Sequence, residues 1–212
     1  MTDDNLFSPR FTIKDVNIHK KERIFKKYFA IDEYQLSYKR FDGTQSQVFT
    51  REIFERDANA VGILIYDVKT DEVALIEQFR PGALNDPQSP WLIEIVAGMV
   101  DSGESEIQAA VREVKEEIGL EIKERDLHLI SSILPSPGGI SEKVTVYIAK
   151  ADLSKLGEHG GLASDGEDIR IFKAKFDDAY MQVENGRIHN AIAMLSLMYL
   201  KLHKSAITQS FA

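Results

Sequence analysis

A helix with three crowded glutamates, set between segments that alternate like strands, constrains the fold of this chain most strongly. In the stretch GMVDSGESEIQAAVREVKEEIGL, residues 98–120, apolar residues recur at helical spacing, which predicts a helix over residues 104–118 with one face toward the core. These apolar residues are Ile107, Ala110, Val111, Val114 and Ile118. Gly119 follows as the expected C-terminal cap. A helix framed by strands predicts a mixed α/β sandwich.

The remaining elements are predicted from alternation and turn residues. One hairpin is expected around Asp42–Gly43 and a second around residues 69–71. Residues 90–98 are predicted as one short core strand containing Trp91, with further strands within residues 127–134, 143–151 and 168–176 and helices at 176–186 and 189–203. The last helix has an apolar face suited to burial in the fold or at an interface, made of Ile192, Leu195, Met198, Tyr199 and Leu202.

The three glutamates Glu113, Glu116 and Glu117 share the side of the helix away from its apolar stripe. Like charges at this spacing destabilise an isolated helix by a few tenths of a kcal/mol per pair, although Arg112 can pair with Glu116. One interpretation is a solvated charged face. The other is a site for a hard divalent cation, because Mg²⁺ binds carboxylate and carbonyl oxygens and shares its remaining positions with substrate phosphates. The glycine-containing loop that leads from a strand into this helix favours the second interpretation.

Charge and composition exclude several classes of protein. The net charge of -8 argues against a protein that grips nucleic acid through its phosphates. The chain has no cysteine, and therefore neither disulfides nor thiolate metal sites. Its N-terminus, MTDDNLFSPRF, lacks the basic and apolar regions of a signal peptide. No apolar run approaches the ~18 residues of a membrane span, so we expect a soluble cytoplasmic protein without a membrane partner.

The glutamate-rich stretch also matches a known family at every position of that family's motif. Gly98 is followed after five residues by Glu104, and after seven more by REVKEEIGL, which begins at Arg112. In this the chain resembles the Nudix hydrolases. The resemblance implies an α/β/α sandwich, here with an N-terminal antiparallel β extension, that hydrolyses nucleoside diphosphates linked to another group. It also implies a divalent cofactor, Mg²⁺ or Mn²⁺.

We call this motif, residues 98–120, the Nudix box. The resemblance implies roles for individual residues in it and beside it. Glu113, Glu117 and the carbonyl of Ala97 are expected to bind the metal ion. Glu116 is expected to assist as a further ligand or as a partner of the attacking water. Glu104 and Arg112 are expected to orient the ligands.

Segments outside the box resemble those of bacterial ADP-ribose pyrophosphatases. They are REIFER at 51–56, LIEQFR at 75–80, PWLIEIVAGM at 90–99, SPGGISE at 136–142 and GLASDGEDI at 161–169. A proline beyond the box is associated with ADP-ribose in these relatives, and Pro137 fills that role, with Pro135 as the competing position and a plain turn as the alternative. Arg51 and Arg80, ahead of Arg56, are expected to contact the phosphates and ribose. Tyr28 is expected either to stack on the adenine or to pack as a core or hairpin aromatic.

The loop HGGLASDGEDI is the expected source of the general base, because it is glycine-rich, acidic and followed by a strand. Glu167 corresponds to a metal-assisting glutamate of the relatives. Where they carry a second glutamate this chain has Asp165, which is shorter by one methylene. The base is therefore left open between Asp165, Glu167 and Glu142 of GGISE.

The resemblance also implies how the chain assembles. Residues 1–56 are expected to form an extension that exchanges between two protomers and completes the substrate site, while residues 57–212 form the Nudix domain. The predicted protein is a homodimer that hydrolyses the small molecule ADP-ribose. The alternatives are a GDP-mannose or other nucleotide-sugar pyrophosphatase, and a sensor that binds ADP-ribose without hydrolysing it. The intact box and the lack of an attached DNA-binding module argue against the sensor.

Overall fold

The computed structural model describes residues 6–162 and 166–211, and the chain divides into two compact units. One unit is Met1–Asp57 with Ser136–Glu142, and the other is Ala58–Pro135 with Lys143–Ala212. Among the described residues, no helix has both the length and the apolar character needed to cross a membrane.

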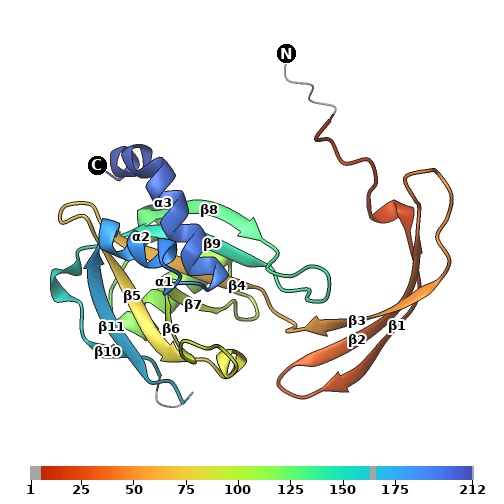
Figure 1. Cartoon of the computed structure of the whole chain (residues 1–212), viewed down its shortest axis with the longest axis horizontal. Helices are drawn as coiled ribbons and strands as arrows, with labels where there is room; N and C mark the ends of the chain where they lie inside the picture. Colours follow the sequence, from red (N-terminus) through yellow and green to blue (C-terminus); the bar gives the residue numbers. More distant parts are fainter. Residues whose placement is uncertain (1–5, 163–165, 212) are drawn as a thin grey trace. The chain divides into compact units, whose positions relative to one another are not determined.

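The N-terminal unit is built on a three-stranded antiparallel sheet (Figure 1). Its strands β1 (Val16–Lys26), β2 (Ala30–Tyr38) and β3 (Phe49–Glu55) pair in chain order. The predicted hairpin around Asp42–Gly43 is confirmed between β2 and β3. Its turn forms because Gly43 adopts a φ of 87° and the Asp42 carboxylate accepts the Thr44 backbone N–H at 2.8 Å.

The second unit contains one large mixed sheet. Its main strand order is β10 (His159–Gly160), β11 (Ile169–Lys175), β5 (Glu72–Phe79), β4 (Ala60–Asp67), β9 (Val144–Lys150) and β8 (Leu127–Ile133). The hairpin predicted at residues 69–71 joins β4 to β5, and Asp71 takes a φ of 54° in its turn. β4 and β9 run parallel and β4 is buried along its whole length, as expected for a central strand covered on both faces.

The single strand predicted over residues 90–98 is wrong. The chain forms two short strands, β6 (Trp91–Glu94) and β7 (Val96–Met99), which pair with β5 and β4 respectively. Ile95, between them, is buried in the core. A short apolar run does not reveal such a change of partner, because both strands are largely apolar. Trp91 is likewise not a core residue: it is 52% exposed and lies against the Phe79 ring, with centroids 5.2 Å apart.

Helices cover both faces of the large sheet, which makes the unit an α/β/α sandwich (Figure 1). The helix α1 (Glu106–Ile118) packs on one face with Ala110, Val114 and Ile118. On the opposite face lie α2 (Phe176–Glu184) and α3 (Ala191–Ser210). The predicted mixed α/β class is therefore confirmed.

Parts of two predicted apolar helix faces are not buried in the fold. Ile107, assigned to the core stripe of α1, is 38% exposed. On α3, Met198 and Leu202 are exposed, so for them only the alternative of an interface stays a prediction. The buried face is formed by Ala193, Ser196, Leu197, Leu200 and Ile207. This helix also continues past residue 203 to Ser210. Because α3 is apolar on most sides, its periodicity does not identify one face, and packing against the sheet decides which residues are buried.

Candidate active site

Local sequence determines where α1 begins and ends. The Ser105 hydroxyl accepts the Gln108 backbone N–H, and the Gln108 side chain accepts the Ser105 N–H in return. At the other end Gly119 adopts a φ of 70° and its N–H donates to the Lys115 carbonyl. These caps hold the glutamates of the box on a regular helix, three and four residues apart.

Two of the three glutamates are buried, contrary to a solvated face. Glu113 is 9% exposed and Glu117 is 3% exposed. Both lie where α1 meets β7, and the Ala97 backbone N–H donates to Oε2 of Glu117 at 3.3 Å. The solvated interpretation is therefore wrong for these two residues, because water cannot reach most of their surface.

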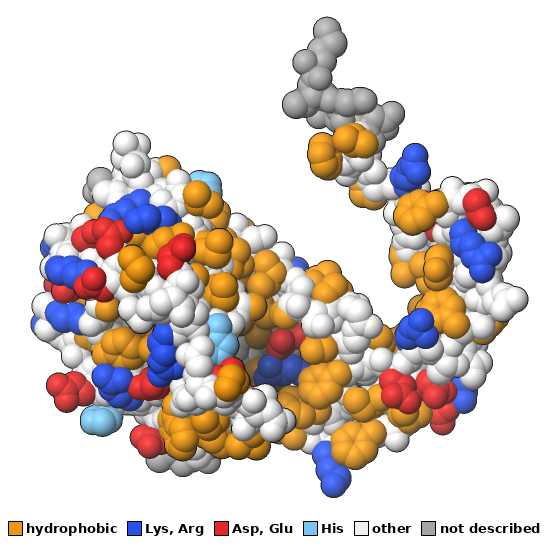
Figure 2. Space-filling model, in the orientation of Figure 1, with side chains coloured by type: hydrophobic (Ala, Val, Ile, Leu, Met, Phe, Trp, Pro, Cys, Tyr) orange, Lys and Arg blue, Asp and Glu red, His pale blue; other side chains and the backbone are white. Residues whose placement is uncertain are grey.

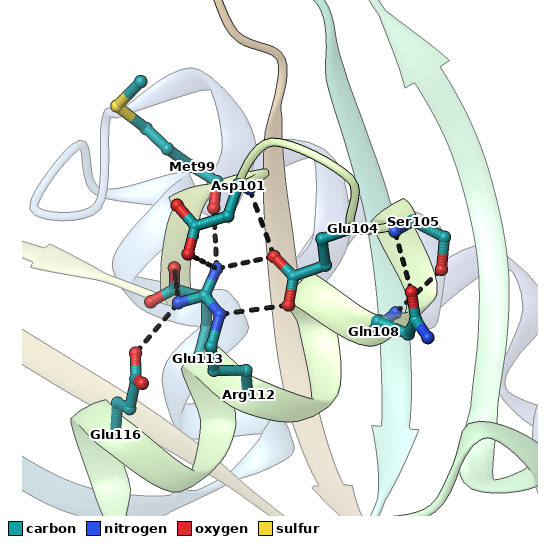
Figure 3. Close-up of polar contacts among 8 residues, drawn as sticks. All are labelled: Met99, Asp101, Glu104, Ser105, Gln108, Arg112, Glu113 and Glu116. Atoms are coloured by element: carbon teal, nitrogen blue, oxygen red, sulfur yellow. Dashed lines mark hydrogen bonds and ion pairs between the residues drawn. The ribbon is translucent and has the colours of Figure 1, made fainter.

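Arg112 is the centre of the polar network on α1 (Figure 3). Its guanidinium contacts both carboxylate oxygens of Glu104, at 3.1 and 2.9 Å. It also donates to Glu113 at 2.7 Å, to Glu116 at 2.9 Å and to the Met99 carbonyl at 2.8 Å. The contact between Arg112 and Glu116 is thereby confirmed. The guanidinium of Arg112 thus hydrogen-bonds three carboxylates and the end of β7, and the Asp101 carboxylate lies 3.9 Å from it. The contact with Arg112 lowers the pKa of Glu104.

The first glycine of the box is required for close approach. A Cβ at Gly98 would lie 1.9 Å from Cδ of Glu113 and 2.0 Å from its Oε1. Only glycine lets β7 lie this close to the Glu113 carboxylate. Because the obstructing atoms are the end of a flexible side chain, a methyl group there would displace the carboxylate rather than the fold.

We therefore expect Gly98→Ala to lower kcat by about a hundredfold, because the displaced Glu113 no longer reaches its working position. The unfolding temperature should stay within a few degrees of the wild type. Steady-state kinetics and calorimetry check the two quantities. As a control, Gly103→Ser alters a glycine of the loop that follows β7, with open space around its Cβ, although its φ of 85° adds strain. A Gly98→Ala enzyme with wild-type kcat would contradict the close-packing argument.

Burial makes the charged forms of Glu113 and Glu117 unfavourable in the absence of a cation. Burial raises the pKa of Glu113 above its ordinary value despite the contact with Arg112. Burial, together with the charges of Glu113 and Glu167, raises the pKa of Glu117 to about 9, while the Ala97 N–H and the charge of Arg80 act in the opposite direction. Two neighbouring buried carboxyls therefore resist ionisation together, and a cation between them would relieve the repulsion.

The acidic loop is fastened to the end of α1. The Gly161 N–H donates to the Glu117 carbonyl at 3.2 Å, and a Cβ at Gly160 would lie 1.8 Å from that oxygen. Glu167 folds back over this turn, where its carboxylate accepts the Leu162 N–H at 3.1 Å. The structure therefore brings Glu167 near Glu113 and Glu117. Asp165, the other predicted loop carboxylate, lies outside the described residues.

Arg80 is the predicted phosphate contact that belongs to this unit. It directly follows the last residue of β5, and its Nε and Nη2 lie 2.9 and 2.8 Å from Oε2 of Glu94 on the neighbouring strand β6. Glu94 was not singled out from the sequence. The sequence signal was a single carboxylate within a short apolar strand that leads toward the box. A buried carboxylate needs a paired or hydrogen-bonded partner, so its position there indicated one.

The other predicted residues lie in the N-terminal unit. Arg56 and Glu142, 86 residues apart in sequence, form an ion pair at 2.6 Å. Arg51 stacks over the Phe49 ring at 4.8 Å. Tyr28 is 75% exposed and contacts the Phe29 ring edge-on, so it is not a core residue. Pro137 is exposed in a turn closed by hydrogen bonds from Gly139 and Ile140 to the Ser136 carbonyl, whereas Pro135 belongs to the second unit.

The oxygen atoms of the candidate site are of the kind that a hard divalent cation binds. Carboxylates of Glu113, Glu117 and Glu167 act on one another, and a backbone strand passes beside them at Ala97. In the described part of the chain no three acidic or histidine side chains already converge as a finished metal site. Glu113 is instead held by Arg112, so it would have to exchange or share that contact to bind a cation.

The sequence of the chain matches known proteins over most of its length. Residues 56–187 match the family model described as NUDIX domain. The chain is 40% identical over 202 residues to the ADP-ribose pyrophosphatase of Escherichia coli (strain K12), covering 95% of each chain. It is 36% identical over 204 residues to the ADP-ribose pyrophosphatase of Haemophilus influenzae, covering 95% of this chain and 93% of that one. A GDP-mannose pyrophosphatase of Escherichia coli (strain UTI89 / UPEC) is 30% identical over 190 residues, covering 89% and 96%.

Proposed function

The chain belongs to the Nudix family, and we propose that it hydrolyses ADP-ribose to AMP and ribose 5-phosphate. One observation carries the choice of substrate. Identity reaches 40% across 95% of both chains with a protein named ADP-ribose pyrophosphatase, against 30% with one named GDP-mannose pyrophosphatase. The reaction adds water across the diphosphate bond, so each phosphorus leaves in one of the two products.

Nudix hydrolases generally use divalent metal ions, and we assign the ligands to this chain's own oxygens. Glu113, Glu117 and the carbonyl of Ala97 would hold the ion, with Glu167 joining from the loop and Glu116 assisting. We propose Mg²⁺ as the cellular ion, with Mn²⁺ as a substitute. A bound cation would neutralise the diphosphate and lower the pKa of the attacking water.

The protein residues supply position, charge and a proton acceptor. Arg112 and Glu104 hold the glutamates in register through the contacts between them. Arg80 offers a guanidinium to the diphosphate. A carboxylate of the loop, Asp165 or Glu167, takes the proton from the attacking water, with Glu142 as the remaining candidate.

The N-terminal unit is proposed to complete the substrate site in a homodimer, by exchange of residues 1–56 between protomers. Hydrophobic side chains gather on its exposed surface (Figure 2). They include Ile24, Phe25, Tyr28, Phe41 and Val48. Such a surface favours a protein partner. In this arrangement Tyr28 stacks on the adenine, Arg51 and Arg56 contact the phosphates and ribose, and the turn at Pro137 borders the ligand.

Light scattering at micromolar concentration should give twice the monomer mass if the exchange takes place. The matched variant is Phe25→Ser, which removes one exposed ring of this surface without opening the core of either unit. It should weaken the dimer and lower activity in proportion to the monomer formed, since each site is shared. A wild-type monomer with full activity would contradict the proposed assembly.

The substrate is tested by phosphate release coupled to alkaline phosphatase. ADP-ribose should lead GDP-mannose, ADP-glucose and NADH in kcat/KM by about tenfold or more, on the order of 1.4 kcal/mol of transition-state discrimination. EDTA should abolish the activity, and added Mg²⁺ or Mn²⁺ should restore it. A lead by GDP-mannose would keep the metal helix and its chemistry but reject the substrate. Activity that is unaffected by EDTA would reject the metal assignment.

A further inference from the structure

We propose that Glu94 is a positioning residue that holds the guanidinium of Arg80 in place for the diphosphate of the substrate. This inference rests on the proposed function, since it concerns how that same site grips its ligand. Glu94 itself would not touch the substrate. It would act through Arg80.

The contacts around Glu94 are concentrated on one oxygen. Oε2 of Glu94 lies 2.9 Å from Nε and 2.8 Å from Nη2 of Arg80. The same oxygen accepts the side-chain amide of Gln78 at 3.3 Å. Two of the three guanidinium nitrogens are thus engaged, while Nη1 makes no hydrogen bond to a described residue. The arginine is fixed on one edge and has its other edge left for a ligand.

Burial distinguishes the two partners. The Glu94 side chain is 12% exposed, whereas that of Arg80 is 40% exposed. The carboxylate therefore lies underneath and the guanidinium lies on top, facing open space. A buried carboxylate without its cation would be costly, so the pair is held in one arrangement.

The backbone also fixes the base of Arg80. Its N–H donates to the Pro90 carbonyl at 2.8 Å, where β5 and β6 meet. The charge of Arg80 acts on Glu117 from this position, as described for the active site. The held guanidinium thus lies within electrostatic reach of Glu117, where a diphosphate bound to the proposed metal ion would need a counter-charge.

Glu94 would serve two purposes in this arrangement. It removes most of the rotational freedom of a long side chain before the substrate arrives, so less is lost on binding. It also gives Arg80 a partner other than the box carboxylates, which keeps those oxygens available. Both effects require the ion pair between Glu94 and Arg80, so a side chain of the same shape without the charge should not replace Glu94.

The test is a double-variant cycle of Glu94→Gln and Arg80→Ala on the full-length protein, with kcat and KM measured on ADP-ribose. Glu94→Gln should raise KM by about tenfold and change kcat by less than about threefold, because ground-state and transition-state binding weaken alike. The double variant should match Arg80→Ala alone to within about threefold, because residues that act as one unit are not additive. Additive losses, or a wild-type KM in Glu94→Gln, would overturn the proposal.

The chain offers a matched control in Glu77→Gln. Glu77 is on β5, the strand that precedes Arg80, and pairs with two arginines, Arg170 at 2.7 Å and Arg187 at 2.9 Å. It points to the opposite face of the sheet from Gln78, so its loss should leave KM unchanged. An equal rise in KM in this control would show a general effect of the strand and would also overturn the proposal.

Two further measurements keep the test decisive. Arg80→Lys leaves Glu94 intact but offers one nitrogen in place of the fork, so it should raise KM about as much as Glu94→Gln does. Calorimetric binding of ADP-ribose in EDTA should show the same pattern in Kd without any turnover. If the wild type hydrolyses no nucleotide diphosphate, the proposed function fails. The Kd values of ADP-ribose for the wild type, the two single variants and the double variant then still test the role of Glu94.

Discussion

Replacing Glu117 by glutamine is expected to lower kcat on ADP-ribose by at least about a thousandfold, an activation cost on the order of 4 kcal/mol. Glutamine keeps the size of the side chain and can still accept the Ala97 N–H, so the fold has no reason to change. What is lost is a negative charge among the oxygens assigned to the cation. Steady-state kinetics at saturating Mg²⁺ measure the effect.

The same substitution should make the metal-free protein more stable. The pKa of Glu117 is raised from 4.5 to about 9, so between these values the folded protein holds a proton that the unfolded chain has lost. The free energy of unfolding therefore falls as pH rises through this window, and a residue that does not ionise removes that loss. In EDTA, the unfolding temperature of the wild type should fall more steeply from about pH 5 to 9 than that of Glu117→Gln.

These two measurements check each other. Lys115→Gln is a suitable control, because Lys115 is on the same helix but pairs with the exposed Glu121. It should alter neither kcat nor the pH dependence of stability by much. A Glu117→Gln protein that keeps about a tenth or more of wild-type kcat would reject Glu117 as a metal ligand. If the unfolding temperatures of the wild type and Glu117→Gln fell equally with pH, burial would not raise the pKa of Glu117.

Removing both loop carboxylates, in Asp165→Asn with Glu167→Gln, is expected to lower kcat by about 10²- to 10⁴-fold. The reason is that the loop is fastened by Gly161 to the end of α1, which keeps Glu167 near the box glutamates. Single variants then separate the roles. The base is the residue whose loss alone gives most of the effect, and the partner's loss should mainly raise the metal concentration needed for half-maximal activity.

A control for this prediction lies in the same loop. Asp168 is exposed, so Asp168→Asn removes one loop charge without touching the proposed chemistry. It should change kcat by less than about threefold. If the double variant stays within a few-fold of the wild type, the loop is not the source of the base, and Glu142→Gln becomes the variant to test.

Much of the candidate site's local geometry could be predicted because it depends on residues close together in the sequence. The box residues lie within one helix and the loop before it, and helical spacing alone places Glu113, Glu116 and Glu117 together. Capping by Ser105 and Gly119 is likewise decided by neighbours in the chain. The contact between Arg112 and Glu116 followed from the same geometry.

Other parts depended on contacts between segments distant in sequence. Periodicity could not show that residues 90–98 change partner at Ile95, because both halves are apolar. Nor could it show that the apolar α3 buries Leu197 and Leu200 while leaving Leu202 exposed. In each case the deciding factor is which neighbour covers the residue, and a single sequence does not contain that information.

By itself, then, the sequence predicted which residues make up the candidate site: a capped helix of crowded glutamates, an acidic glycine-rich loop and a set of arginines. The tertiary structure alone decided which of them are buried and which contact one another. Burial of Glu117 raises its pKa, Gly98 and Gly160 are required because backbone passes against other atoms there, and Glu94 holds Arg80 from a neighbouring strand. The physical reason is that desolvation, close approach and ion pairing depend on distance in space, whereas spacing along the chain fixes distance only within one helix or turn.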